Sequence, residues 1–271
     1  MIVVTTPTGN IGSRVLTDLL ANTEPIRVIA RDPDRLAPEA RKRVEVVVGS
    51  HGDSAVVTRA FQDADSVFWV VPPDPGAASV AAAYVDFARP AIVVPAGLAT
   101  ASFAMDDLIA SAGVSYRALT MPSFMENLLR QVESISTNGA FFLPIDGDRK
   151  LPSAAASDVA RVAARLLLDH SWTGVASVPI LGPEDLSYND MARILSEVLG
   201  RPVRFEQISN DAFKARLIGR GMSDAMAQGN VDMWIAKGNG IDNAVTRTPE
   251  SSTPTTFRDW ASQVLRARVA P

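Results

Sequence analysis

A glycine-bearing turn near the start of the chain constrains the fold most strongly. Ile2-Val-Val-Thr5 is a β-branched run, and Thr6-Pro-Thr-Gly-Asn-Ile-Gly12 follows it directly. The segment after the turn repeats apolar residues at helical spacing, namely Ile11, Val15, Leu16, Leu19 and Leu20. A strand that enters a tight glycine turn and then a helix is the first half of a βαβ unit, so the sequence predicts a parallel sheet.

The same alternation of strand and helix continues through the first half of the chain. Further strand-like runs lie at Ile26–Ala30, Val44–Val48, Ser66–Val71 and Ala91–Val94. Helices are expected between them, including residues 53–63 and 77–88. Single helices between strands imply right-handed crossovers and a parallel sheet covered on both faces. The predicted fold class is therefore α/β, a doubly wound parallel sheet of the Rossmann type.

The C-terminal part of the chain predicts a smaller α/β portion. Ser123-Phe-Met-Glu126 and Ser187-Tyr-Asn-Asp190 both match the pattern in which a hydroxyl and a carboxylate begin a helix. A strand at Val203–Glu206 and a final helix near Thr255 follow. We expect a nucleotide-binding domain over residues 1–150, with a returning segment near 175–182, and a smaller substrate-cleft portion over residues 151–271.

Composition excludes several classes of function. The formal net charge of −4 argues against general attraction to nucleic acid or anionic lipid. Apolar runs such as Val67–Val71 are too short to span a bilayer. The chain has no cysteine, which suits a reducing cytoplasm, and its two histidines, His51 and His170, lie far apart in sequence. We therefore expect a cytoplasmic protein without a metal site.

The glycine turn has the features that a bound diphosphate requires. A phosphate needs backbone N–H groups, close approach of the chain and preferably the positive end of a helix. Gly9 permits close approach, and Gly12 lets the helix pack tightly on the first strand. Thr6 stands where such turns usually have their first glycine, and Pro7 favours an extended Thr6. An ordinary strand-to-helix connection is the alternative, but the position inside a βαβ unit favours dinucleotide binding.

The residue after the second strand distinguishes two cofactors. An NAD-type site places a carboxylate there for the ribose hydroxyls, whereas this chain has Arg31 in Ala30-Arg-Asp-Pro33. A guanidinium matches a 2′-phosphate in charge and geometry. Arg31 could instead be a solvated arginine in a charged segment. We favour NADP(H) over NAD(H) as the cofactor.

Several stretches together resemble a known family. They are Val4-Thr-Thr-Pro-Thr-Gly-Asn-Ile-Gly12, Ala30-Arg-Asp-Pro33, Pro122-Ser-Phe-Met-Glu-Asn127, Ser157-Asp-Val-Ala160, Leu181-Gly-Pro-Glu-Asp-Leu-Ser-Tyr188 and Leu199-Gly-Arg-Pro-Val203. In this order they resemble the NmrA-like branch of the atypical short-chain dehydrogenases/reductases. That resemblance implies an NAD(P)-binding Rossmann domain and a small C-terminal portion that closes over a substrate cleft. Some members reduce quinones, dyes or activated double bonds, and others bind the nucleotide and regulate a partner.

The resemblance also implies the cofactor contacts. They are Thr8, Gly9, Asn10, Ile11 and Gly12 at the diphosphate, Arg31 at the adenosine phosphate, Val71 and Pro72 on the adenosine side, and Pro95 and Pro122 near the nicotinamide. The sequence departs from the family pattern at Thr6, where glycine is usual, and at Ser50, where an acid is common. The adenine contacts at Ser50 are therefore an open question.

The substrate end is less well marked. By the same resemblance, Phe124 and Asn127 face the reacting end of the cofactor. Asn127 is the one candidate for orienting a carbonyl, although it is equally suited to serve its own helix. Met222, Met226 and Trp234 can line an adaptable apolar pocket or simply pack in the core.

The proton-donating pair of ordinary short-chain dehydrogenases is absent. That pair is a tyrosine with a lysine four residues later. The positions four residues after Tyr84, Tyr116 and Tyr188 hold Ala88, Thr120 and Ala192. Acceptors that need little acid assistance, such as quinones, dyes or polarised alkenes, remain compatible, because the cofactor carries the hydride.

Three hypotheses follow. The first is an NADPH-dependent reductase of a conjugated, largely apolar small molecule. The second is an NADP(H)-sensing regulator without turnover, and the third is a scaffold that has lost cofactor binding, as Thr6 and Ser50 suggest. Both a homodimer and a protein partner are compatible with the sequence. We favour the first hypothesis. An apolar cleft beside Phe124 and the methionine segment would support it, whereas a closed or polar cleft would support the sensor.

Overall fold

The computed structural model describes residues 1–70, 75–77 and 107–269. The chain groups into two compact units. The first unit consists of Met1–Pro73, Tyr84–Ile92 and Ala156–Gly174, and the second of Asp74–Ala83, Val93–Ala155 and Val175–Pro271. The expected boundary near residue 150 stays a prediction. The expected helix over 77–88 and strand over 91–94 lie almost entirely outside the described residues.

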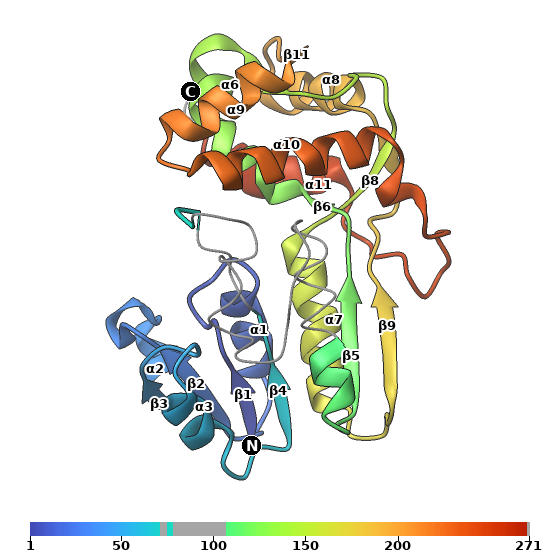
Figure 1. Cartoon of the computed structure of the whole chain (residues 1–271). Helices are drawn as coiled ribbons and strands as arrows, with labels where there is room; N and C mark the ends of the chain where they lie inside the picture. Colours follow the sequence, from blue (N-terminus) through green and yellow to red (C-terminus); the bar gives the residue numbers. More distant parts are fainter. Residues whose placement is uncertain (71–74, 78–106, 270–271) are drawn as a thin grey trace. The chain divides into compact units, whose positions relative to one another are not determined.

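Within the described residues, the first unit is built on a parallel sheet of four strands (Figure 1). Its strands are β1 (Ile2–Val4), β2 (Ile26–Ala30), β3 (Glu45–Val48) and β4 (Ser66–Phe68). They are ordered β3-β2-β1-β4, and every neighbouring pair is parallel. The predicted α/β class with a parallel, doubly wound sheet is confirmed.

Both faces of this sheet are covered. Helix α3 (Ser54–Phe61) packs Val56 and Ala60 onto one face, where they meet Val3, Ile29 and Val47. Ile2, Val4 and Val28 are fully buried as well, and strand alternation directs them to the opposite face. Each such buried side chain contributes about 1.5–3 kcal/mol to folding.

Two further helices of the first unit pack against each other. Helix α1 (Gly12–Leu19) follows the glycine turn and buries Val15, Leu16 and Leu19. Helix α7 (Ala156–Leu168) comes from far along the chain and contacts both α1 and β4. The Ser66 hydroxyl donates a hydrogen bond of 3.2 Å to the Leu167 carbonyl and so fixes α7 beside β4.

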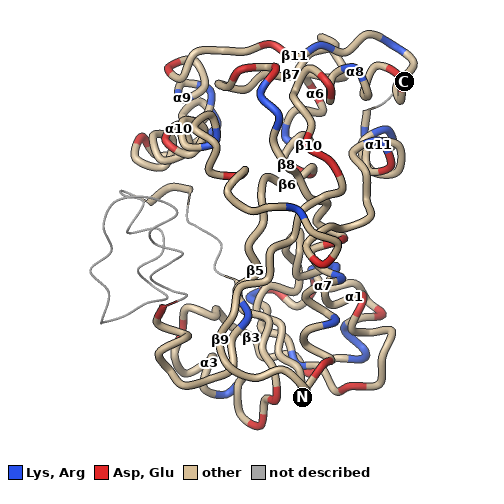
Figure 2. Tube along the Cα trace, turned by 90° about the vertical axis from the view of Figure 1, so that its right-hand side faces the viewer, with Lys and Arg blue, Asp and Glu red and all other residues tan. Residues whose placement is uncertain are grey.

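The charged segment between β2 and β3 forms two short helices. They are the 3₁₀-helix η1 (Pro33–Arg35) and the helix α2 (Pro38–Arg41). Each begins with a proline, which helices tolerate in their first turn because the N–H group that proline lacks would have no partner there. Figure 2 shows acidic and basic residues interspersed along both units. Arg27 on β2 and Glu45 on β3 form one such cross-strand pair, with N and O atoms 2.9 Å apart.

The described part of the second unit contains three small sheets. β5 (Tyr116–Thr120) pairs in parallel with β9 (Val175–Pro179). β6 (Ser123–Phe124), β8 (Leu151–Ala154) and β10 (Asp185–Leu186) form a sheet ordered β10-β8-β6. β7 (Ala140–Leu143) pairs in parallel with β11 (Arg204–Gln207), which confirms the strand predicted near residue 203.

Helices enclose the core of the second unit. They are η2 (Met125–Gln131), α6 (Val132–Asn138), α8 (Tyr188–Leu199), α9 (Asn210–Gly219), α10 (Asp224–Gly238), η3 (Ile241–Asn243), α11 (Phe257–Trp260) and the π-helical η4 (Ala261–Leu265). Phe141, Leu195, Phe257 and Trp260 form the centre of the core. The final helix predicted near Thr255 is confirmed, because Thr256 caps α11.

The two predicted helix starts have different outcomes. Ser187 begins α8 as predicted: its hydroxyl accepts from the Asp190 N–H at 3.0 Å, and the Asp190 carboxylate accepts from the Ser187 N–H at 3.2 Å. The prediction for Ser123 is wrong. Ser123 lies in β6 and pairs with Ser153 of β8, so η2 begins later, at Met125, without a side-chain cap.

Candidate cofactor and substrate sites

The turn after β1 is stabilised by its own backbone. The Gly9 N–H donates to the Thr6 carbonyl at 3.0 Å, and the Ser13 N–H donates to the Gly9 carbonyl at 3.0 Å. Thr6 does not have a positive φ, since Asp63 is the only non-glycine residue with one in the described part of the chain. The turn therefore forms without the backbone conformation for which its first glycine is usually needed.

Gly12 is required by close packing. A Cβ built on Gly12 would lie 1.9 Å from the Thr6 carbonyl oxygen, whereas one on Gly9 would lie 3.3 Å from the same atom. Any side chain at position 12 would therefore push α1 away from the turn. This contact gives a physical reason for the glycine that the sequence shows at the start of the helix.

The N-terminus of α1 is open. Ile11 occupies the cap position and makes no side-chain hydrogen bond, and the first turn carries no acidic residue. Within the described residues, the backbone N–H groups of Thr8, Asn10 and Gly12 have no hydrogen-bond partner. Free N–H groups at the positive end of a helix attract an anion, so this turn has the donors that a diphosphate needs.

Two neighbouring side chains fix the turn. Arg14 donates to both the carbonyl and the side-chain oxygen of Asn10, which places a positive charge beside the open helix end. The Thr5 hydroxyl is buried, donates to the Phe68 carbonyl at 3.1 Å and accepts from the Val70 N–H at 3.2 Å. Sequence reasoning missed Thr5, although a hydroxyl that ends an otherwise aliphatic strand was the available signal.

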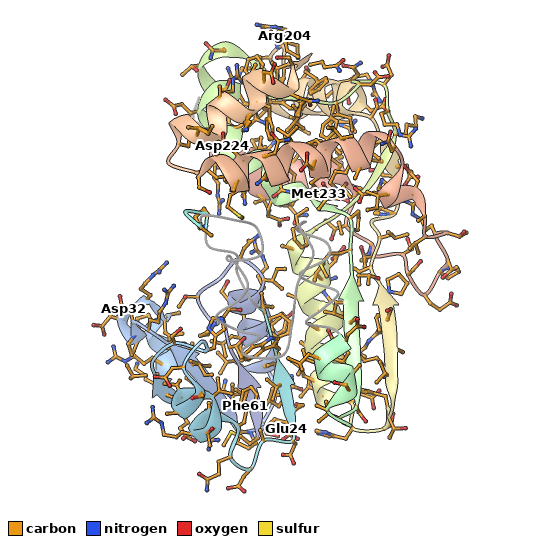
Figure 3. The ribbon with its side chains drawn as sticks, in the orientation of Figure 1. Glu24, Asp32, Phe61, Arg204, Asp224 and Met233 are labelled. Carbon is orange, nitrogen blue, oxygen red and sulfur yellow. The ribbon has the colours of Figure 1, made fainter. Side chains whose placement is uncertain are left out.

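Arg31 follows β2 and is exposed. Its guanidinium makes no hydrogen bond or ion pair with any other described residue. The first acid after the strand, Asp32, has a different use: its carboxylate accepts from the Asp34 N–H at 3.1 Å and caps η1. Figure 3 shows Asp32 on this outer turn. The end of β2 thus presents the Arg31 guanidinium without a described partner. Beside it lies the Asp32 carboxylate, which accepts one hydrogen bond in the cap of η1.

The residues after β3 lie near Arg31. The Ser50 hydroxyl accepts from the Gly52 N–H at 3.1 Å and so closes a local turn. His51 is half-buried, and its ring meets Trp69 edge-on with centroids 5.7 Å apart. Burial lowers the pKa of His51 below the ordinary histidine value of 6.5, and the positive charge of Arg31 lowers it further. His51 is therefore neutral at pH 7.

The remaining cofactor residues are only partly visible. Val71, Pro72 and Pro95 lie outside the described residues. Pro122 is buried immediately before β6. Their cofactor contacts stay predictions.

An apolar pocket in the second unit brings together three of the predicted substrate residues. Phe124 and Asn127, from β6 and η2, line it together with Trp234 of α10, and its volume is about 40 Å³. Tyr188 of α8 lines it as well, which the sequence did not indicate.

The two methionines predicted for the pocket have other contacts. Met226 is buried at 2% exposure near the start of α10, and its carbonyl accepts from the Asn230 amide at 2.8 Å. The same amide lies 3.5 Å from the Met222 sulfur. Neither residue lines the described pocket. Figure 3 labels Met233, which is half-buried on the same helix.

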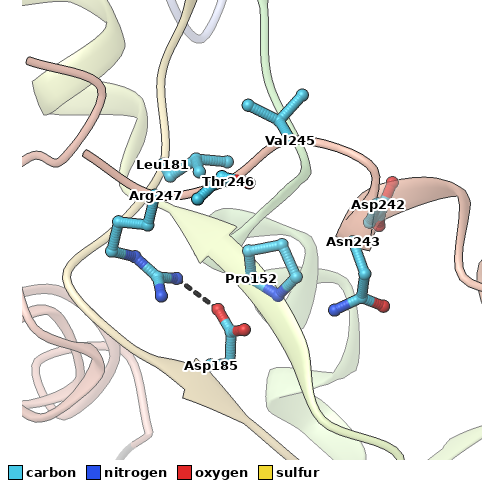
Figure 4. A pocket seen from close by; sticks show the side chains of 8 residues that line it. All are labelled: Pro152, Leu181, Asp185, Asp242, Asn243, Val245, Thr246 and Arg247. Atoms are coloured by element: carbon cyan, nitrogen blue, oxygen red, sulfur yellow. Dashed lines mark hydrogen bonds and ion pairs between the residues drawn. The ribbon is translucent and has the colours of Figure 1, made fainter.

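A second, polar pocket of about 220 Å³ also lies in the second unit (Figure 4). Arg247 and Asp185 form an ion pair across it, and the Arg247 Nε donates to the Gly182 carbonyl at 2.8 Å. Asp242, at another side of the pocket, pairs with Lys237. These charged groups already satisfy one another, so they hold the loop after η3 in place.

The described residues contain no cluster of three or more histidine, aspartate or glutamate side chains that could hold a metal ion. Among them, none of the helices combines the length and the hydropathy needed to cross a bilayer.

Comparison with known proteins identifies relatives of both parts of the chain. A family model described as NAD(P)H-binding matches residues 7–94, and the model of the NmrA-like family matches residues 104–261. A (4-alkanoyl-5-oxo-2,5-dihydrofuran-3-yl)methyl phosphate reductase of Streptomyces griseus subsp. griseus is 30% identical over 98% of this chain and 99% of its own length. An NAD(P)H azoreductase of Xenophilus azovorans is 27% identical over 86% of each chain. Quinone oxidoreductase 2 of Escherichia coli is 26% identical over 94% of this chain and 95% of its own.

Solved structures share the fold. An Escherichia coli NADPH-dependent quinone oxidoreductase in complex with NADPH superposes with a TM-score of 0.77 at 22% identity, covering 97% of this chain and 99% of the other. The Citrobacter triphenylmethane reductase in complex with NADP(H) has a TM-score of 0.75 at 18% identity and full coverage of both chains. Because the NmrA-like model spans more than half of the sequence and the Streptomyces relative matches nearly all of it, this chain belongs to the NmrA-like family.

Proposed function

We propose that this protein is an NADPH-dependent reductase of a conjugated, largely apolar small molecule such as a quinone or an enone. The observation that carries the proposal is the open N-terminus of α1, where free backbone N–H groups meet the glycine turn. The chain is an NAD(P)H-dependent oxidoreductase of its family. The preference for NADPH over NADH and the class of acceptor are the specific parts of the proposal, and each is supported by separate observations.

The residues of the first unit fit the nucleotide. The N–H groups of Thr8, Asn10 and Gly12 would donate to the diphosphate, and the missing Cβ at Gly9 leaves room for it. Arg14 holds the Asn10 side chain, so the turn is ordered before the nucleotide binds. An ordered turn loses less conformational entropy on binding, which favours affinity.

The end of β2 supports NADPH over NADH. Arg31 is exposed and free of carboxylate partners among the described residues, so its guanidinium is available to a 2′-phosphate. One oxygen of the Asp32 carboxylate accepts from the Asp34 N–H and caps η1, so the support for NADPH comes from Arg31 and not from the loss of an acceptor at Asp32. Loss of an Arg–phosphate interaction costs about 1.5–3 kcal/mol, which is about ten- to a hundredfold in affinity.

The second unit supports a conjugated acceptor. The pocket beside Phe124 is mostly apolar, and Asn127 at its rim can orient a carbonyl. NADPH supplies the hydride when bound, and the chain lacks the tyrosine–lysine pair of alcohol dehydrogenases. A quinone, an azo bond or an unsaturated lactone accepts hydride with little acid assistance. Relatives named for reducing such groups make this the acceptor class to test first.

Turnover assays test the proposal directly. NADPH absorbance is followed with a panel of quinones and enones, for the wild type and for Arg31→Ala. We expect turnover with at least one acceptor, a Kd for NADPH that rises about ten- to a hundredfold in the variant, and NADH binding that barely changes. Arg220→Ala, at the end of α9, is the matched control. Equal losses for the two nucleotides would contradict the assignment of Arg31.

An NADP(H)-sensing regulator without turnover is the second candidate. The observation in its favour is the small volume of the apolar pocket, about 40 Å³, which is below that of a typical ligand pocket. Tight NADPH binding without turnover across the whole panel would select this candidate. The cytoplasm remains the proposed location, and a homodimer or protein partner stays a prediction.

A further inference from the structure

Tyr188 is a buried phenol that the proposed mechanism has not yet used. It is the first residue of α8 and is only 7% exposed. Its ring stacks on Phe205 with centroids 5.3 Å apart and meets Trp234 edge-on at 5.9 Å. Aromatic neighbours on two sides fix the ring plane, so the position of the hydroxyl is also fixed.

The Tyr188 hydroxyl makes no hydrogen bond with another described residue. Its oxygen is not among the fully buried polar atoms without a partner, so a water molecule or a ligand can reach it. A polar ligand atom can replace such a water molecule when it reproduces the hydrogen bond. The residue lines the apolar pocket that also contains Asn127 and Ser153. An unpartnered donor in the wall of a pocket indicates that a polar atom of a ligand completes its hydrogen bonding.

Burial, together with one nearby negative charge, keeps this phenol protonated. Burial raises the pKa of Tyr188 well above its ordinary value, and the negative charge of Asp242 raises it further. The Asp242 carboxylate is itself paired with Lys237, and both side chains are nearly buried. Tyr188 is therefore a neutral O–H group throughout the physiological range, suited to donate a hydrogen bond and unsuited to give up its proton.

We propose that the Tyr188 hydroxyl donates a hydrogen bond to a carbonyl oxygen of the acceptor and so selects carbonyl-bearing substrates such as quinones and enones. This inference rests on the proposed reductase function and assigns a specificity residue to it. Hydrogen bonding to that oxygen stabilises the negative charge that develops there as hydride arrives at the conjugated system, while the phenol keeps its proton. The role differs from that of the absent tyrosine–lysine pair, in which the tyrosine transfers its proton.

Tyr188→Phe removes the hydroxyl and keeps the ring, so it is the decisive variant. Tyr116→Phe, on β5, is the matched control. With a naphthoquinone as acceptor, we expect kcat/KM to fall about tenfold in Tyr188→Phe. The Kd for NADPH should not change, and the control should behave as the wild type. The melting temperature should stay level, because the hydroxyl makes no hydrogen bond with another described residue.

Two results would overturn the inference. One is an unchanged kcat/KM for the quinone in Tyr188→Phe, whatever happens to the melting temperature. The other is an equal loss with a triphenylmethane dye that has no carbonyl oxygen, which would indicate a general packing effect. Failure of the reductase function itself is distinguishable, since the wild type would then reduce no acceptor.

Discussion

Gly12 is the residue at which the turn is most sensitive to a single methyl group. A Cβ there would lie 1.9 Å from the Thr6 carbonyl oxygen. We expect Gly12→Ala to lower the free energy of unfolding by about 1–3 kcal/mol, as overpacking does, and to weaken NADPH binding because α1 moves away from the turn. Urea unfolding and a binding titration measure the two effects.

Gly219→Ala is the control for this change. Gly219 ends α9, and nothing lies within 4 Å of a Cβ added there. That variant should be neutral or slightly more stable, because alanine loses less backbone entropy on folding. Full NADPH affinity in Gly12→Ala would show that the packing of α1 on the turn does not govern the site.

We expect the stability of the protein to depend on pH through His51. Its pKa in the folded protein lies below the ordinary histidine value of 6.5, chiefly through burial and also through the charge of Arg31. At a pH between these two values the unfolded chain binds the proton more readily than the folded protein. The free energy of unfolding therefore falls as the pH drops from 6.5 through the folded pKa. His51→Gln removes this proton uptake.

Urea unfolding between roughly pH 7.5 and 5.5 tests the histidine effect. The wild type should lose stability over this range more steeply than His51→Gln. The variant's remaining slope belongs to the titratable groups that both proteins share. Identical slopes for the two proteins would contradict the assignment.

At the scale of elements, α8 depends on its capping box. Ser187→Ala removes the hydroxyl that accepts from the Asp190 N–H at 3.0 Å. We expect a loss of about 1 kcal/mol in the free energy of unfolding, measured in urea. Thr137→Ala, an exposed hydroxyl removed from α6, should change it by less than about 0.5 kcal/mol. A loss as small for Ser187 as for Thr137 would mean that other contacts hold the start of α8.

Local signals explain which elements could be predicted. The Ser187 box depends on residues three positions apart, so the sequence alone indicates it. Ser123 carries the same pattern, but its backbone pairs with Ser153, thirty residues away, and no local rule reveals that pairing. The burial of Tyr188 was hidden for the same reason, because Phe205 and Trp234 come from other elements.

At the scale of the whole molecule, alternating strands and helices were enough to predict the parallel sheet of the first unit. The second unit was harder, because its sheets join short strands that lie far apart in sequence. β7 pairs with β11 and β6 with β8, and these strands have only two to four residues each. Such short strands carry little periodicity, so tertiary packing decides their partners.

We propose that the open end of α1 binds the diphosphate of a nicotinamide nucleotide. Isothermal titration calorimetry of the wild-type protein with NADPH and NADH measures this binding most directly. We expect saturable heat with one site per chain and a lower Kd for NADPH than for NADH. Absence of binding heat with either nucleotide, confirmed at a second temperature, would contradict it.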